Sequence, residues 1–302
     1  MLRLLPTFSV GMMSRGLTGR GYTTSPVKAS VALVAKLRKE TSIPMSKARQ
    51  ALIQHNNDYE ATLKWIQEQE VSAGEDKAAK LEGREVKDGL LGVVSHQGKG
   101  AMIELGCETD FVARNPSFRM LTERIAITAL HLDLEQGGEK LLENAPLLPH
   151  PMEQEKGEGG IEEVRTVGEE VSALIGRVGE KVKVRRWARL DLGQEEKKKG
   201  GFMVSRTHGG EGGSGGMSGR MGVLVHGIGD EAGKKGSVTM QVAQHILGMG
   251  PKGVEGEEGL LGQEYLFGGG SVQEILGKEG IEVDGFMRWQ VGEELSREKR
   301  EE

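Results

Sequence analysis

The feature that most constrains the fold is a short segment, ELGCETDFVARNP, that begins at Glu104 and changes from strand to helix. Alternating apolar residues predict a strand that ends at Cys107. Asn115 is suited to cap a following helix, and the proline after it fits the first helical position. Between them lies a turn in which an acid and an aromatic residue stand side by side, Asp110 and Phe111. The segment therefore predicts a tight strand-to-helix connection that carries a large apolar ring.

The environment of that ring has two possible interpretations. A large apolar side chain on a tight connection is costly to leave in water. Spacing alone therefore favours packing of Phe111 into the protein's own core, where most aromatic side chains lie. The alternative is a ring held at the surface for a partner.

The composition excludes several classes of protein. The chain has 302 residues, enough for two or three domains, and its formal net charge of −5 gives no global basic field for a nucleic-acid backbone. Its one cysteine, Cys107, excludes an internal disulfide and a cysteine-built metal site, and is expected to pack as a small buried hydrophobe. No apolar run approaches the ~20 residues that a membrane-spanning helix needs.

The N-terminus differs from the rest of the chain. No acidic residue occurs before Glu40, and three arginines lie among Leu, Phe, Met, Ser and Thr in the first twenty residues. This composition is typical of a mitochondrial transit peptide. We therefore expect residues 1–27 to be a transit peptide and the protein to be localised in the mitochondrial matrix; an ordinary disordered N-terminus is the alternative.

Residues 28–71 predict a bundle of three short helices. Apolar residues recur at helical spacing in each: Val34 and Leu37 in the first, Met45, Ala48 and Leu52 in the second, and Tyr59, Leu63 and Ile66 in the third. Each helix is too short to be stable alone in water, so the three must pack together. Residues 72–88 are polar, have no sustained apolar period and predict a linker.

Residues 89–190 predict a first core subdomain with the order strand, strand, helix, helix, strand. Gln97 and Gly98 separate two runs of alternating apolar residues, which indicates a hairpin. Residues 133–160 predict a loop, and residues 181–190 predict the closing strand. The two helices are marked by apolar residues at helical spacing, Phe118, Leu121 and Ile125 in one and Val164, Val167, Val171 and Leu174 in the other.

The remainder predicts a shorter second core subdomain at residues 219–293, after a Lys- and Gly-rich linker at 191–218 and before a charged tail at 294–302. Its similar element order suggests a diverged duplicate of the first. The predicted fold class is therefore α+β: a small three-helix N-terminal bundle followed by two α+β core subdomains with antiparallel sheets. The expected elements of the second subdomain are a strand at 221–228, a helix at 238–249, a Gly-rich loop at 250–270, a short helix at 272–276 and a strand at 283–291.

No catalytic or cofactor-binding motif stands in its proper context. The G-x-G-x-x-G match at 210–215 neither follows a predicted strand nor opens a helix, as a dinucleotide site requires. The Gly-Lys-Lys at 233–235 lacks the earlier glycine and the following hydroxyl residue of a P-loop. The seven histidines show no metal-binding spacing, and no G-x-S-x-G elbow is present. The sequence therefore predicts no catalytic residue, no metal and no cofactor.

Several segments together resemble the elongation factor Ts family from about Lys28 to Glu293. The most specific is Thr109-Asp110-Phe111-Val112 after Glu-Leu-Gly-Cys-Glu. The first module resembles the family's ubiquitin-associated-like (UBA-like) N-terminal domain. The other matching segments are Leu33–Thr41 with Met45 and Ala51-Leu52, Lys181–Arg186, Gly219–Val225 and Phe286–Glu293.

The resemblance implies a guanine-nucleotide exchange factor for mitochondrial elongation factor Tu, a GTPase, in a 1:1 heterodimer without membrane or direct nucleic-acid contact. It implies that Phe111 wedges between helices of the GTPase beside its Mg²⁺ and phosphate region, supported by Asp110. Thr109 and Val112 complete this partner-binding segment. No covalent step is needed, so the resemblance implies no enzyme.

The resemblance also implies two further contacts with the GTPase. Met45 and Arg49 occupy the positions through which the family's N-terminal module touches the GTP-binding domain. His245 falls at the position of a histidine that belongs to the family's interface.

Two other classes of function remain as alternatives. A ubiquitin-like-fold-binding or scaffold protein would use the three-helix bundle at 28–71 to bind its partner and would leave GDP release unchanged. A small-molecule enzyme would need a convergent polar pocket, which the sequence does not indicate.

Overall fold

The computed structural model describes residues 28–41, 43–133, 140–151, 164–210, 216–229 and 237–294. The expected transit peptide, the Gly-Lys-Lys motif and the charged tail beyond residue 294 lie outside them. Two compact units, 1–65 and 66–302, make up the chain. No helix in the described part is long and apolar enough to cross a bilayer.

The first unit contains three helices, as the sequence predicts: α1 (Val31–Thr41), α2 (Met45–Gln54) and the beginning of α3 (Tyr59–Leu81). Their shared core is formed by buried residues on one face of each helix. The side chain of Asn57, in the turn before α3, accepts from the Ser30 backbone N–H at 2.9 Å and donates to the Lys28 carbonyl at 2.9 Å. This side chain therefore fixes the entry of the chain into α1. The buried residues are Val34, Leu37, Ala48, Ala51 and Leu52.

The third helix extends further than the sequence predicts. The predicted linker at 72–88 is helical as far as Leu81, which is buried. Within the second unit this part of α3 packs on α7 (Val167–Val178) so closely that a Cβ at Gly74 would lie 1.8 Å from the Ser172 carbonyl oxygen. Lys77 Nζ also donates to the Gly176 carbonyl at 2.6 Å. Tertiary contact, rather than an apolar period of its own, stabilises this part of the helix.

The first sheet of the second unit confirms the predicted hairpin. The strands β1 (Asp88–His96), β2 (Lys99–Cys107) and β3 (Val182–Asp191) are antiparallel, and β5 (Ser218–Gly219) extends the sheet in the order β3-β2-β1-β5. Gln97 and Gly98 both have positive φ, at 50° and 73°, which matches the twist of a two-residue hairpin turn.

Two helices pack on this sheet. Asn115 caps α5 (Pro116–His131) by accepting from the Ser117 N–H at 2.8 Å, as predicted. The other helix, α7, begins at Val167 rather than at Val164, because Thr166 and Glu169 form a reciprocal capping box there. The core between sheet and helices includes Ile103, Leu105, Phe118, Ile125, Val167 and Leu174.

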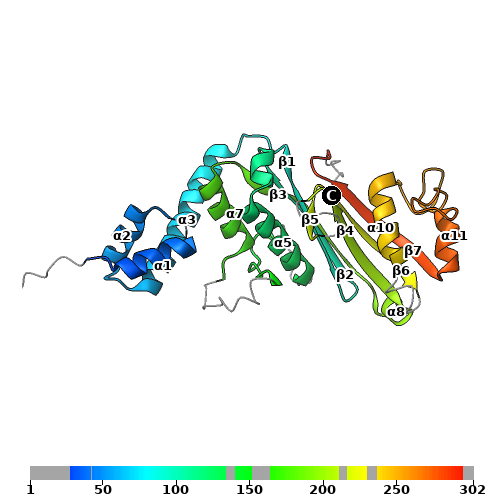
Figure 1. Ribbon diagram of the computed structural model, residues 1–302, viewed down its shortest axis with the longest axis horizontal. Helices are drawn as coiled ribbons and strands as arrows, with labels where there is room; N and C mark the ends of the chain where they lie inside the picture. The colour runs from blue at the N-terminus through cyan, green and yellow to red at the C-terminus, as the bar shows by residue number, and fades with distance from the viewer. Residues whose placement is uncertain are drawn as a thin grey trace, which may run out of the picture. The chain divides into compact units, whose positions relative to one another are not determined.

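The second sheet has the order β4-β6-β7, with strands at Gly201–His208, Met221–Gly229 and Ile281–Gln290. The helices α10 (Ser237–Met249) and α11 (Val272–Lys278) pack with it, and the predicted loop at 250–270 lies between them. The two sheets face each other, and the helices of each subdomain lie on the outer sides (Figure 1). Their shared core contains Leu91, Val93, Met102, Leu224 and Val291.

The segment predicted as a linker at 191–218 contains regular structure. It holds α8 (Gln194–Lys198), all of β4 and the short β5. Phe202 of β4 is buried in the core under α10, whereas Ser205 Oγ accepts from Ser95 Oγ of β1 at 3.0 Å. The strand therefore alternates between two packed faces. Its flanking lysines and glycines conceal this alternation in the sequence.

Candidate functional site

The central feature of the site is a one-turn helix, α4 (Asp110–Ala113), between β2 and α5. Phe111 is 83 % exposed, whereas the next two residues, Val112 and Ala113, are buried. Packing of the ring into the protein's own core, which spacing alone favours, is therefore wrong. The short helix uses Val112 and Ala113 as its anchors and leaves the Phe111 ring in water, where such a side chain is unfavourable.

Thr109 and Glu180 fix the start of this turn. Thr109 is the N-cap of α4, and its backbone N–H donates to Glu180 Oε2 at 3.1 Å. The Thr109 hydroxyl donates to Glu180 Oε1 at 2.8 Å. Sequence reasoning missed Glu180, which follows α7 and is 71 residues away along the chain. A carboxylate that accepts from both groups of Thr109 limits the rotation of the turn that carries Phe111.

A second carboxylate supports the strand end before Thr109. Glu108 accepts from the Lys181 backbone N–H at 2.7 Å and from Arg84 Nη1 at 3.1 Å. These bonds, the Lys181 N–H first, hold the pKa of Glu108 below its ordinary value. The result is a charged frame around the base of α4.

Cys107 is buried beside this frame, as predicted. Its Sγ donates to the Thr109 carbonyl at 3.1 Å. Burial, together with the nearby Asp88 and Glu180 carboxylates, raises the pKa of the thiol to about 12. Because the thiolate is the reactive form, Cys107 is a packing residue in this site and not a nucleophile.

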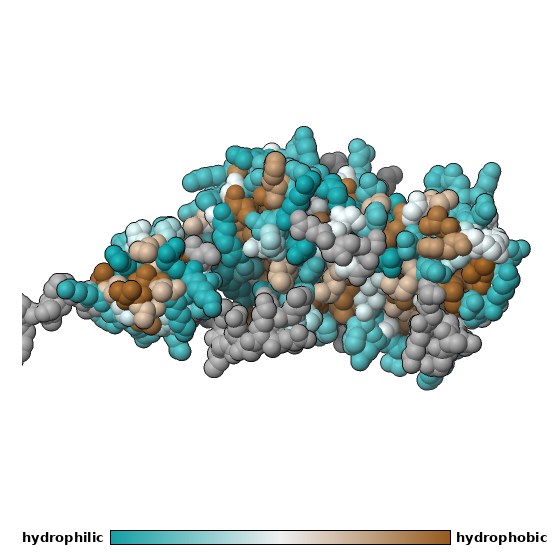
Figure 2. All heavy atoms as spheres, in the orientation of Figure 1, coloured by the Kyte–Doolittle hydropathy of each residue, from teal (hydrophilic) through white to brown (hydrophobic). Residues whose placement is uncertain are grey.

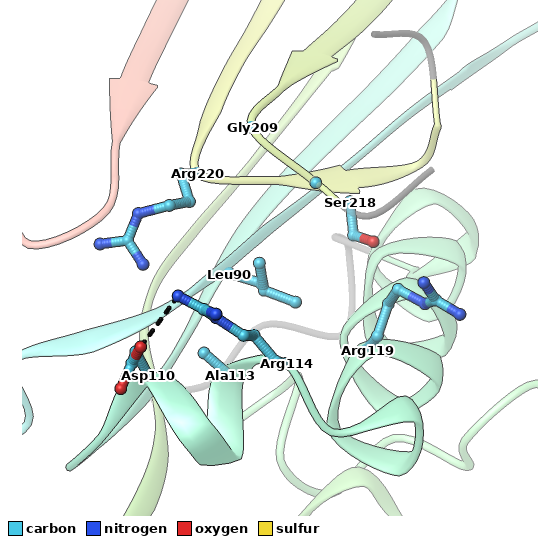
Figure 3. Close-up of a pocket in the computed structure, with 9 residues that line it drawn as sticks. Leu90, Asp110, Ala113, Arg114, Arg119, Gly209, Ser218 and Arg220 are labelled. Carbon is cyan, nitrogen blue, oxygen red and sulfur yellow. Dashed lines mark ion pairs between the residues drawn. The ribbon is translucent and has the colours of Figure 1, made fainter. Parts of the chain in front are cut away.

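Asp110 lies on the exposed side of α4. Its carboxylate pairs with Arg114 Nη2 at 3.0 Å. It also lines a pocket of about 320 Å³ (Figure 3). The other lining residues are Leu90, Ala113, Arg114, Arg119, Gly209, Gly210, Ser218 and Arg220.

The predicted contact residues of the first unit are at its surface. Met45 is the first residue of α2 and about half exposed, and Arg49, one turn later, is exposed. Residues four apart lie on the same face of a helix, so Met45 and Arg49 form one surface. Val31 and Ile53 are also exposed on these helices.

His245, by contrast, is fully buried in α10. Its Nδ1 accepts from the Leu266 backbone N–H at 3.2 Å, and its Nε2 lies 2.9 Å from Gln263 Oε1. The ring stacks on Tyr265 with centroids 5.9 Å apart. Burial lowers the pKa of His245, which keeps the imidazole neutral at pH 7.

The loop that His245 holds through the Leu266 N–H carries two exposed apolar side chains, Leu266 and Phe267. Both are close to half exposed, and sequence reasoning missed them. Their only sequence signal is an aliphatic-aromatic pair in front of a run of glycines. In Figure 2 hydrophilic residues cover most of the visible face, and apolar surface is gathered in small separate patches.

The part of the chain that the structure describes contains no cluster of three or more His, Cys, Asp or Glu side chains suited to a metal ion. The distinctive feature of the site is the exposed Phe111 ring on a turn that Thr109 and Glu180 hold in place. Such an arrangement is suited to fill a pocket in another protein, as buried aromatic anchors do at protein interfaces. The class defined by fold and site is therefore an α+β protein-binding factor.

Comparison with known proteins identifies the family. The family described as "Elongation factor TS" matches residues 108–258, which include α4. The chain is 32 % identical over 288 residues to "Elongation factor Ts, mitochondrial" of Nematostella vectensis, covering 86 % of this chain and 98 % of that protein. It is 31 % identical over 286 residues to the protein of the same name in Salmo salar, covering 90 % and 89 %.

The chain belongs to the elongation factor Ts family. It is accordingly a nucleotide exchange factor that binds the GTPase elongation factor Tu in translation elongation, and it is not an enzyme.

Proposed function

We propose that this chain accelerates GDP release by inserting the Phe111 ring into elongation factor Tu beside the Mg²⁺ and phosphates. The exposure of the ring on a turn held from both sides supports this proposal. A factor that binds the nucleotide-free GTPase more tightly than the GDP form must weaken GDP binding by the same factor. In this proposal the Phe111 ring is the contact that makes the affinity for the nucleotide-free form higher than the affinity for the GDP form.

The neighbouring residues have distinct roles in this proposal. Val112 fixes α4 to the core, and Thr109 fixes its first turn through Glu180. Asp110 faces the partner next to Phe111, with Arg114 paired to it at 3.0 Å. A preorganised turn loses little conformational entropy on binding, so more of the contact energy is available to displace GDP.

Further contacts spread the interface over the rest of the chain. The UBA-like module at 28–71 contacts the GTP-binding domain through Met45 and Arg49. Within the second core subdomain, His245 contributes through the loop that it holds, which presents Leu266 and Phe267.

The cellular setting completes the proposal. The relatives named above are mitochondrial proteins by name, and residues 1–27 have the composition of a transit peptide. The chain acts in the mitochondrial matrix after removal of this segment and forms a 1:1 heterodimer with elongation factor Tu. The first core subdomain of the chain lies at 89–190, and its second at 219–293 together with β4, which pairs with β6.

The test is release of a fluorescent GDP analogue from mitochondrial elongation factor Tu. Wild-type protein accelerates the release, and Phe111→Ala loses most of the acceleration, because a buried aromatic anchor contributes about 2 kcal/mol or more. The matched control is Val164→Ala, another exposed large apolar residue truncated to the same methyl group. Full acceleration by Phe111→Ala would remove the ring from the mechanism.

A further inference from the structure

The pocket beside α4 is formed by parts of both core subdomains. Its walls are the turn of α4 and the beginning of α5 on one side and the segment around Gly209 and Ser218 on the other. Leu90 of β1 and Ala113 are buried and form an apolar floor. A side chain that enters the pocket is therefore partly withdrawn from water.

The lining is rich in positive charge. It contains three arginines, Arg114, Arg119 and Arg220, against one carboxylate, that of Asp110. In Figure 3 the guanidinium groups of Arg114 and Arg220 both lie on the side of Asp110, whereas Arg119 lies on the opposite side near Ser218. Asp88, outside the lining, offsets part of this charge through its pair with Arg220, but the arginines still outnumber the two carboxylates. The remaining positive charge favours an anion, and an apolar floor strengthens the attraction by lowering the local dielectric.

Arg114 and Arg220 keep donors for such an anion. Arg114 pairs with Asp110 through Nη2, and Arg220 pairs with Asp88 through Nη1, so each of these salt bridges engages one terminal nitrogen. Both side chains are substantially exposed, at 71 % and 48 %. A guanidinium has five N–H donors in a planar fork that matches the two oxygens of a carboxylate.

The size and lining of the pocket indicate what kind of anion it takes. A volume of about 320 Å³ is at the lower end of the ~300–1,000 Å³ of sites for whole small molecules. No aromatic residue among those that line it could stack on a nucleotide base. The fit is to an acidic side chain rather than to a nucleotide.

The position of the pocket identifies the molecule that supplies this side chain. Asp110 lines the pocket, and Phe111, the next residue, is the exposed ring. A surface that accepts Phe111 therefore also covers the opening beside it. This step rests on the proposed insertion of Phe111 into elongation factor Tu.

We infer that the pocket lined by Arg114 and Arg220 is a second docking point for elongation factor Tu, and that it receives an aspartate or glutamate side chain of the GTPase next to the Phe111 contact. The charge pair fixes the orientation in which the ring enters. It also accelerates the encounter of the two proteins, because charge complementarity acts strongly on association rates.

The experiment measures affinity and association rate for elongation factor Tu at increasing KCl concentrations with Arg114→Gln, Arg220→Gln and the double variant. Each single variant binds about tenfold more weakly at low salt, in the range found for close charge pairs. The double variant also shows a weaker dependence of affinity on salt. The control is Arg177→Gln, which removes a comparable surface ion pair with Glu170 outside the pocket lining and changes affinity less than about twofold.

A charge reversal identifies the partner residue. Arg220→Glu weakens binding further, and a single Asp→Lys or Glu→Lys change on the GTPase restores it. If the double variant binds with wild-type affinity while the separate variant Phe111→Ala binds more weakly, the pocket inference alone is overturned. Wild-type binding by all of these variants would overturn the Phe111 proposal as well.

Calorimetry with pyrophosphate and the free protein separates the two sources of an anion. The inference predicts no measurable binding at millimolar pyrophosphate. Tight binding that is lost in the double variant would mean that the pocket holds a phosphate ligand, and would overturn the assignment to a carboxylate of the GTPase.

Discussion

The two core subdomains have the same plan but use it differently. In each, two antiparallel strands come first, helices follow, and a third strand returns beside the second, giving the orders β1-β2-β3 and β4-β6-β7. The third strand carries a one-residue bulge at the same register of the middle strand, opposite Glu104 in the first and His226 in the second. This shared irregularity supports descent of both from one ancestral unit, because bulges are kept as designed features within families.

The side chains at the two bulges differ completely. In the first subdomain the extra residue is Arg185, which with Arg186 pairs with the buried Glu104. In the second, the bulge brings Gly285 against His226, where a Cβ would lie 2.6 Å from Nε2. The same kind of bulge therefore has two uses. In the first subdomain it places Arg185 and Arg186 around Glu104, a group called the charge clamp below, and in the second it allows close packing of Gly285 on His226.

The charge clamp also ties the end of the chain to the first sheet. Glu104 Oε1 accepts from the Gly292 N–H at 3.0 Å, and Arg186 Nη2 pairs with Glu293 at 2.9 Å. The Arg186 guanidinium lies 4.3 Å from the centroid of the Trp289 ring. The first subdomain, which carries Phe111, thus holds the second in place. Buried charge therefore joins the two subdomains at the bulge of the first sheet, whereas the bulge of the second sheet has no such pair.

The largest expected effect is at this clamp. Glu104→Ala leaves two guanidinium groups near the interior without their carboxylate, which costs about 3–5 kcal/mol of unfolding free energy. The equivalent change in the second subdomain, His226→Ala, costs less than about 1 kcal/mol, because no buried charge is left unpaired. Urea unfolding of both variants measures the difference. Equal losses would contradict the distinction between clamp and packing.

The next effect concerns the contact of the two sheets. A Cβ at Gly222 would lie 2.5 Å from Val93 Cγ2, so Gly222→Ala forces β6 away from β1 and costs about 1–3 kcal/mol. The matched control is Gly248→Ala in α10, where the nearest atom is 3.8 Å away and alanine gains up to about 1 kcal/mol. Thermal unfolding should shift in opposite directions. Unchanged or increased stability of Gly222→Ala would contradict close packing of the two sheets at this position.

A smaller effect on stability, with a larger effect on activity, is expected at Glu180. Glu180→Ala releases both groups of Thr109 and costs about 1–2 kcal/mol, since hydrogen bonds to charged groups contribute about 1.5–3 kcal/mol and this one is half-buried. We expect faster hydrogen exchange in α4 and several-fold slower GDP release. Glu180→Gln, which keeps one acceptor oxygen, retains most of the activity. Unchanged exchange of α4 amides in the alanine variant would show that Glu180 does not brace the turn.

The smallest effect is a pH dependence in the second subdomain. The pKa of His245 in the folded protein is lower than its ordinary value of about 6.5, so the unfolded chain takes up the proton more readily. The contribution of His245 to the free energy of unfolding is therefore fully present above about pH 6.5 and is lost as the pH falls below this value. Unfolding in urea at several pH values measures this, and His245→Gln should show a weaker decline. An identical pH profile in the two proteins would contradict the buried, neutral state.

Much of the fold could be predicted from the sequence because its signals are local. The hairpin at Gln97-Gly98 and the cap of α5 at Asn115 depend on neighbouring residues alone. The strand β4 and the end of α3 could not be predicted, because their stability comes from contacts with distant segments. Propensity is a weak prior where tertiary packing decides.

The candidate site shows the same division. Asp110 and Phe111 are identifiable from their motif, but the exposure of the ring depends on burial of Val112 and Ala113 beneath it. Glu180 and Arg220 reach the site from far along the chain, so no local pattern could indicate them. Burial of His245 is indicated by its position on the apolar side of its helix, next to Ile246, whereas its partners Gln263 and the Leu266 N–H come from the loop that covers it.

The most direct test of the central claim compares the affinities of wild type and Phe111→Ala for elongation factor Tu in its nucleotide-free and GDP-bound states. If the ring drives exchange, the variant loses about 30-fold in affinity for the nucleotide-free form, equivalent to about 2 kcal/mol, and far less for the GDP form. Equal losses in both states would make Phe111 a general anchor and would contradict its role in displacing GDP.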